Sequence, residues 1–196
     1  MYNWNAWEYT REPLPIGWPT PWWMDKRHVE FIYDIIMASK FRTLLEIGCH
    51  TGCSTSAIIQ ALKDGCKTEV HLCDPDDNEI LKKMIGETKI TRHMNDSLRV
   101  IPQREWDLVI VDGDHSLKQV SRELGLLLYY EVPTIIAHDV TYPSCDGAVY
   151  LSEALRVHPD YKCAIDSMKR ENEYTHRGLL YASRYDLNLE IWSKHV

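Results

Sequence analysis

The sequence predicts a doubly wound α/β domain with a mostly parallel sheet, and three observations lead to this fold class. Short apolar runs of strand length alternate along the chain with periodic stretches of helix length, as in parallel strands joined by crossover helices. Glycine or other turn residues separate many of these runs. The 196-residue chain is 44% apolar and 26% charged, which suits one globular domain with a substantial core.

The first expected element is a helix over residues 25–39, where apolar side chains recur at intervals of three and four residues. A strand follows at 44–47, and then a helix at 54–64 that Gly65 ends in the C-terminal cap position. The remaining elements predicted for the first half are a strand at 70–73, a helix at 77–85 stopped by Gly86, and a weak strand at 89–93.

The second half repeats the alternation. Four consecutive apolar residues at 108–111 predict a buried strand, and a helix is expected at 116–130. The remaining predicted elements are strands at 134–137, 161–165 and 179–183 and a helix at 149–157, with a polar connection before the last strand. Ligands of such sheets bind beyond the carboxyl ends of the strands, so functional residues are expected there.

The first 24 residues differ from the rest because they are rich in tryptophan, tyrosine and proline. Proline at this density prevents a continuous helix, so we expect an extended or turning arm that precedes a domain over 25–196. Its aromatic rings suit stacking on a planar or sugar-like substrate, and they suit anchoring the arm to the core equally well.

Composition bears on the partners and the compartment. The net charge of −7 argues against a nucleic-acid partner. The sequence has neither an apolar run of about 20 residues nor a basic segment followed by an apolar one at its start, so no membrane span or signal peptide is expected. The six cysteines form no Cys-x-x-Cys pair, which favours reduced thiols and a cytoplasmic protein. Formation of a homo-oligomer is an alternative that the sequence leaves open.

The turn after the first strand suits a nucleoside cofactor. Gly48 and Gly52 let the backbone approach a ligand closely, and Glu46 lies two residues before the first glycine. A dinucleotide site would have three glycines and would not favour a carboxylate beside the pyrophosphate. Glu46 suits the sulfonium and amino groups of S-adenosylmethionine better than it suits NAD. The alternative is an ordinary strand–turn–helix corner.

Two further segments add candidates for binding such a cofactor. Asp74 follows the second strand, where an acidic residue can accept both ribose hydroxyls, although it could also be a turn residue. Asp76 or Asp77 can cap the next helix, which leaves Asp74 available. Asp96 and Ser97 precede the fourth strand and can bond the adenine edge, or they can belong to a polar loop.

Acidic residues and histidines follow the next two strands. The candidates are Asp112, Asp114, His115, His138 and Asp139, which adjacent parallel strands would bring to one rim. Crowded carboxylates are costly unless a cation or a proton lies between them, so this set suits a divalent ion. Capping by Asp114 or Ser116 and a turn at Asp139 are the alternatives.

Three runs together resemble the metal-dependent class I O-methyltransferases of the catechol, caffeoyl-CoA and macrolide-sugar types: residues 45–55, 111–115 and 136–140. The resemblance implies a seven-stranded Rossmann-like sheet with helices on both faces, and methyl transfer from S-adenosyl-L-methionine to a hydroxylated small molecule. The implied donor-binding residues are Glu46, Gly48, Gly52, Ser54, Asp74, Asp96 and Ser97. The implied metal ligands are Asp112, His138 and Asp139.

The basic residue of the family's Asp-x-x-His run falls on His115, the predicted general base. The sequence departs from the family at His138, where members carry Asp or Glu. An imidazole shifts the preference from Mg²⁺ towards Mn²⁺, Fe²⁺ or Zn²⁺, or it indicates that the metal has been lost. N-methylation, cleavage of the donor and a non-catalytic nucleoside-binding module are the rival hypotheses.

Overall fold

The computed structural model describes residues 24–167 and 177–195. The predicted N-terminal arm lies outside the described residues except for Met24, which is buried in the core. Most of the polar connection before the last strand also lies outside them. The strands are β1 (Thr43–Ile47), β2 (Glu69–Cys73), β3 (Thr91–His93), β4 (Leu108–Val111), β5 (Thr134–His138), β6 (Lys162–Asp166) and β7 (Leu179–Ser183).

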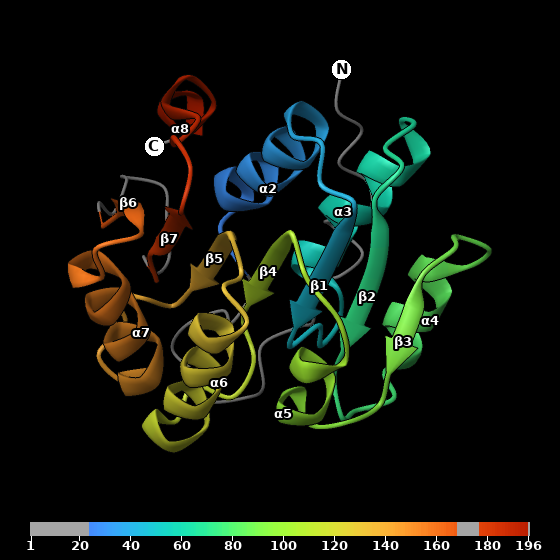
Figure 1. The fold of residues 1–196 in the computed structure, drawn as a ribbon. Coiled ribbons are helices and arrows are strands. Elements are labelled where there is room, and N and C mark those ends of the chain that lie inside the picture. Colours follow the sequence, from blue (N-terminus) through green and yellow to red (C-terminus); the bar gives the residue numbers. More distant parts are fainter. Residues whose placement is uncertain (1–23, 168–176, 196) are drawn as a thin grey trace, which may run out of the picture.

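The helices that alternate with these strands are α2 (Lys26–Ala38), α3 (Cys53–Lys63), α4 (Glu79–Ile85), α5 (Ser97–Val100), the 3-10 turn η1 (Ile101–Gln103), α6 (Leu117–Tyr129), α7 (Asp146–Val157) and α8 (Leu189–His195). The strands form one sheet of order β3-β2-β1-β4-β5-β7-β6 (Figure 1). Strand β7 pairs antiparallel with both β5 and β6, and the other described pairings are parallel, so the predicted seven-stranded, mostly parallel sheet is confirmed.

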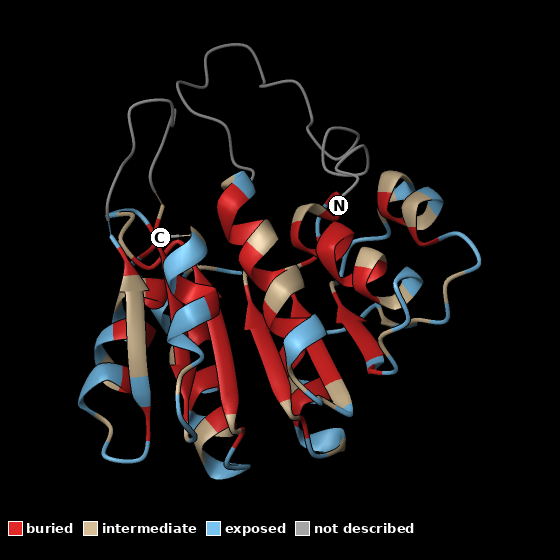
Figure 2. Cartoon of the chain, turned by 90° about the horizontal axis from the view of Figure 1, so that it is seen from above, coloured by how far each residue is buried: buried red, intermediate tan, exposed pale blue. Residues whose placement is uncertain are grey.

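Two buried clusters lie on opposite faces of this sheet. Successive side chains of a strand point to opposite faces, so Leu44 and Leu108 belong to one cluster and Leu45 and Val109 to the other. The first cluster includes residues of α2, α3 and α8, and the second includes residues of α6 and α7 (Figure 1). The central strands are accordingly buried along most of their length (Figure 2).

Several boundaries differ from the prediction. Helix α4 begins at Glu79, and Asn78 caps it by accepting hydrogen bonds from the amides of Ile80 and Leu81, so the predicted cap at Asp76 or Asp77 was wrong. Helix α7 begins at Asp146, three residues before the predicted start. The short helices α5, η1 and α8 were not predicted, because three to seven residues show too little periodicity.

All six cysteines are free, as predicted, and the cytoplasmic location inferred from them stays a prediction. Among the described residues, no helix has the length and apolar character needed to cross a membrane.

The sheet brings the predicted site residues to one edge. The last residue of β1, Ile47, pairs with Cys73 of β2 on one side and with Val111 of β4 on the other. Val111 in turn pairs with Ala137 of β5. The loops that leave these four strands therefore start side by side.

Candidate active site

The glycine turn after β1 packs directly on the turn after β4. Gly48 has a φ of +81°, and its amide donates to the carbonyl of Cys73 over 2.9 Å. A Cβ at this position would lie 2.2 Å from the carbonyl oxygen of Asp112 and 2.3 Å from the Cα of Gly113. Glycine is therefore required at position 48 by the neighbouring backbone as well as by the turn.

Gly52 has a different environment from the one expected. It caps α3 in a left-handed conformation with a φ of +92°. A Cβ there would meet Met84 Cε at 2.1 Å and Leu81 Cδ1 at 3.0 Å, both on α4. Side chains of α4 thus fill the space where a Cβ of residue 52 would lie. The ligand that the sequence predicted to approach this glycine therefore does not occupy that space.

Glu46 lies under the same turn with no exposed surface. One carboxyl oxygen accepts a hydrogen bond from the Ser54 hydroxyl, and the other accepts one from Thr55 Oγ1 at 2.7 Å. Burial raises the pKa of Glu46 to about 7, and the two hydroxyl bonds only partly offset that effect. Glu46 and Ser54 therefore join the end of β1 to the first turn of α3, and their predicted contact with the donor stays a prediction.

Asp74 connects the end of β2 to the glycine turn. One of its carboxylate oxygens accepts hydrogen bonds from the amides of Cys49 and His50, each at 2.8 Å, and the other accepts from the Asp76 amide at 2.9 Å. The turn that the sequence offered as an alternative is therefore present. A carboxylate has about four acceptor positions, so Asp74 can also accept bonds from a ligand.

A cleft of about 440 Å³ opens over these strand ends. Its lining includes Gly48 and five acidic residues: Asp74, Asp96, Asp112, Asp114 and Glu123. No lysine or arginine belongs to its described lining. Such a cleft is unfavourable for a pyrophosphate and favourable for a ligand that carries positive charge.

The far wall of the cleft is a polar cluster between α5 and α6. Asp96 is exposed and caps α5 through the amide of Leu98 at 2.9 Å, a bond that lowers the pKa of its carboxyl. Ser97 is buried and donates to Glu123. Gln119 Nε2 contacts Asp96, Ser97 and Glu123 at 3.0 to 3.2 Å, so both loop residues predicted to bind adenine lie in one network.

The predicted metal ligands do lie together. The donor atoms of Asp112, His138 and Asp139 all fall within 4.8 Å of one another. His138 Nδ1 is 3.1 Å from an oxygen of Asp112 and 3.5 Å from one of Asp139. Burial lowers the pKa of His138, but the two carboxylates outweigh it and raise that pKa to about 9. Without an ion, a protonated His138 balances part of the acidic charge.

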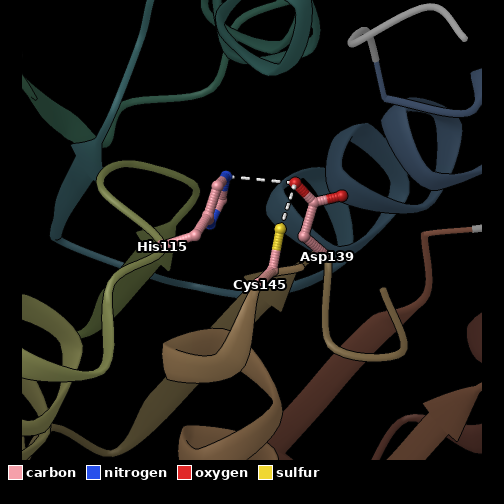
Figure 3. A group of neighbouring side chains, drawn as sticks. All are labelled: His115, Asp139 and Cys145. Atoms are coloured by element: carbon pink, nitrogen blue, oxygen red, sulfur yellow. Dashed lines mark hydrogen bonds and ion pairs between the residues drawn. The ribbon is translucent and has the colours of Figure 1, made fainter. Parts of the chain in front are cut away.

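Asp139 interacts with several neighbouring side chains at this rim. It follows β5 with a φ of +60°, a left-handed conformation that Asp tolerates better than most residues, and it is only 2% exposed. His115 Nε2 lies 3.0 Å and Cys145 Sγ 3.7 Å from the same oxygen, and Figure 3 shows both side chains directed at it. Arg177 donates to both oxygens at 3.1 and 3.3 Å.

Burial and the neighbouring charges shift the pKa values of Asp139 and His115 in opposite directions. Burial raises the pKa of Asp139, but His138, His115 and Arg177 lower it well below its usual range. Burial lowers the pKa of His115. The bond to Asp139 and the negative charges of Asp112 and Asp139 raise this pKa by more, so it lies above its ordinary value. Burial raises the pKa of the Cys145 thiol to about 12, so this cysteine is not a thiolate at neutral pH.

The comparisons with known proteins agree with this geometry. Residues 45–140 match a family model described as a methyltransferase domain. The chain has the methyltransferase fold. An O-methyltransferase of Streptomyces achromogenes, crystallised with S-adenosylmethionine and involved in tomaymycin synthesis, superposes with a TM-score of 0.70 at 16% identity, covering 91% of this chain and 89% of that one.

Two other solved structures are similar. The Bacillus cereus O-methyltransferase in complex with S-adenosylhomocysteine has a TM-score of 0.67 at 17% identity, covering 82% of this chain and 81% of that one. The Podospora anserina methyltransferase PaMTH1 has a TM-score of 0.68 at 14% identity, covering 92% and 86%. A search of curated protein sequences gives no significant match. The resemblance to class I methyltransferases that the sequence indicated is confirmed, and methylation of a hydroxyl group stays a prediction.

The methyltransferase fold thus gathers most of the predicted residues and adds others. Gly48, Asp74, Asp96, Ser97 and Asp112 line the cleft. Glu46, Gly52 and Ser54 lie behind the glycine turn, outside the described lining of the cleft. The prediction missed Gln119, Glu123, Cys145 and Arg177. Of these four residues, only Gln119 and Glu123 gave a signal in the sequence, which is their i, i+4 spacing on one face of a predicted helix.

Proposed function

We propose that this methyltransferase transfers the methyl group of S-adenosylmethionine to a hydroxyl group of a small molecule. The observation that carries the proposal is the acidic cleft at the ends of β1, β2 and β4, whose described lining has no lysine or arginine. S-adenosylmethionine carries a sulfonium, an ammonium and a carboxylate group, with a net positive charge and no phosphate, whereas NAD carries a pyrophosphate. The cleft suits the former by charge alone.

Asp74 is the proposed partner of the ribose hydroxyls, because it lies at the end of β2 and retains acceptor capacity. Ser97 and its neighbours suit the base, and the glycine at position 48 lets the donor approach the backbone of the turn closely. Glu46 supports this turn from below through Ser54 and Thr55. In this proposal the sugar and the base occupy separate regions of the cleft.

His115 is the proposed general base. Its Nε2 faces Asp139, which leaves Nδ1 as the nitrogen that takes the proton from the acceptor hydroxyl. The hydroxyl oxygen forms its bond to the methyl carbon while the carbon–sulfur bond breaks, and S-adenosylhomocysteine leaves with the electron pair of that bond. Asp139 holds the imidazole and stabilises the imidazolium that forms, a role for which its buried, ionised carboxylate is suited.

The rim is also the proposed site of a divalent ion. Asp112, His138 and Asp139 offer one nitrogen and two carboxylates within 4.8 Å, a donor set that suits Mn²⁺, Fe²⁺ or Zn²⁺ better than Mg²⁺. When bound, such an ion makes a neighbouring hydroxyl more acidic. Binding requires His138 to release its proton, and Asp139 is shared with Arg177 and His115.

The proposed acceptor is a hydroxylated small molecule of the sugar or aromatic type. The test is to incubate the full chain with S-adenosylmethionine and a panel of catechols, hydroxycinnamates and glycosides, and to measure S-adenosylhomocysteine and the methylated product. The proposal expects a methyl ether with at least one hydroxyl class. Methylation of amines alone would instead favour N-methylation. Conversion of S-adenosylmethionine to methionine or 5′-methylthioadenosine, with no S-adenosylhomocysteine, would favour cleavage of the donor.

A further inference from the structure

One buried acid in the cleft has no role in the mechanism above. Glu123 lies on α6, is 1% exposed, and belongs to the lining of the cleft. Its Oε1 accepts hydrogen bonds from Ser97 Oγ and from Gln119 Nε2 at 3.2 Å. Its Oε2 is buried and has no hydrogen-bond partner among the described residues.

A buried carboxyl oxygen without a partner is unfavourable, and native proteins rarely leave one unless a ligand completes the site. Burial also raises the pKa of Glu123. Two hydroxyl or amide donors already bind Oε1, so Oε2 is the atom left to interact with a ligand in the cleft.

We propose that Glu123 selects the purine base of the nucleoside by accepting a hydrogen bond from its 6-amino group. This inference rests on the proposed function, which brings an adenosine into the cleft. Asp74 and Glu123 line the same cleft, one from the end of β2 and the other from α6, so a nucleoside whose ribose lies at Asp74 can direct its base towards Glu123. Ile47 and Cys73 supply apolar lining for the faces of the ring.

The polarity of this contact is fixed by its neighbours. Gln119 Nε2 donates to Asp96 and Glu123, so its amide nitrogen, and not its oxygen, faces the cluster. The bonds that Ser97 and Gln119 donate to Oε1 favour the carboxylate form of Glu123 against the effect of burial, and in that form Oε2 is an acceptor. Adenine has a donor at position 6, whereas hypoxanthine has an oxygen there that a carboxylate would repel. The site should therefore prefer adenosine over inosine derivatives.

Glu123→Gln tests this polarity because it changes the charge and leaves the shape nearly unchanged. The donors on Ser97 and Gln119 should hold the new amide oxygen in the position of Oε1, which leaves the amide NH₂ group in the position of Oε2. The variant then presents a donor to the base, which suits a 6-oxo group. Glu153→Gln makes the same substitution at an exposed position of α7 and serves as the matched control.

The measurement is isothermal titration calorimetry of S-adenosylhomocysteine and S-inosylhomocysteine with each protein. The wild-type protein and Glu153→Gln should bind the adenosyl compound at least about 10-fold more tightly than the inosyl compound. In Glu123→Gln this ratio should fall at least about 10-fold, through weaker adenosyl binding and stronger inosyl binding. An unchanged ratio in a variant that still binds S-adenosylhomocysteine would overturn the role of Glu123 and leave the proposed function intact.

The wild-type protein gives a second test that does not depend on the folding of a variant. An analogue of S-adenosylhomocysteine whose base is unsubstituted purine lacks the 6-amino group and should bind at least about 10-fold more weakly. Equal affinity for the two compounds would refute the inference. Absence of binding by S-adenosylhomocysteine itself would refute the proposed function and this inference together, so the two failures are distinguishable.

Discussion

Replacing Glu46 by glutamine should make the stability of the protein less dependent on pH. Burial raises the pKa of this carboxyl from 4.5 to about 7. Its stabilising effect is therefore fully present below the unfolded-state pKa near 4.5 and is lost as the pH rises through about 7. A difference of about 2.5 pKa units corresponds to about 3 kcal/mol, and most of it, about 2.5 kcal/mol, develops between pH 5 and 8.

Glu46→Gln has no charge to bury, and the hydroxyls of Ser54 and Thr55 can donate to or accept from its amide. The free energy of unfolding should be measured by urea denaturation at several values between pH 5 and 8. The variant minus wild-type difference should rise in favour of the variant by about 2.5 kcal/mol over that range. Because both proteins share every other titrating group, a difference that stays flat would refute the account of Glu46. Glu153→Gln, at an exposed position, should differ from wild type by less than about 0.5 kcal/mol.

Three further predictions concern the turn, the ion and the base. Gly48→Ala should lower the free energy of unfolding, measured by urea denaturation, by at least about 2 kcal/mol, because the new Cβ would lie 2.2 Å from a backbone oxygen. Gly125→Ala, whose Cβ would meet nothing within 4 Å, should not lower it, and equal effects of the two substitutions would contradict the packing described. Activity should be lost in chelator and restored better by Mn²⁺ or Zn²⁺ than by Mg²⁺, and full turnover in chelator would exclude the ion. In calorimetry, Asp112→Ala should abolish Mn²⁺ binding while S-adenosylhomocysteine still binds. His115→Ala should lower kcat about 10²–10⁴-fold with little change in donor affinity, and it should remove the acidic limb of the pH–rate profile, because a general base acts only in its unprotonated form. Near-normal kcat with an unaltered profile would assign the base to another group.

The fold was largely predictable because its signal is local. The apolar run at 108–111 became β4, and residues 134–137 became most of β5, since a buried parallel strand needs four or five consecutive apolar residues. Boundaries were less predictable where a cap depends on detail, as at Asn78, whose side chain and not those of Asp76 or Asp77 accepts from the amides of α4.

The site was predictable only to the extent that strand ends define it. Asp112, His138 and Asp139 follow β4 or end β5, so the parallel order alone places them together. Arg177 pairs with Asp139 across 38 positions of sequence, and Ser97 bonds Glu123 across 26. Such pairs depend on how separate segments pack, which composition and periodicity do not encode. The packing of β5 beside β4 likewise brings Asp139 to within 3.0 Å of His115.

Calorimetric titration of the full chain with S-adenosylhomocysteine and, separately, with NAD tests the central claim most directly. The acidic cleft, with Asp74 at the end of β2, predicts that S-adenosylhomocysteine binds at one site per chain with an affinity on the order of micromolar, and that NAD gives no measurable heat. Asp74→Asn should weaken the first interaction and leave the fold unchanged. Tight binding of NAD with no response to S-adenosylhomocysteine would contradict the account.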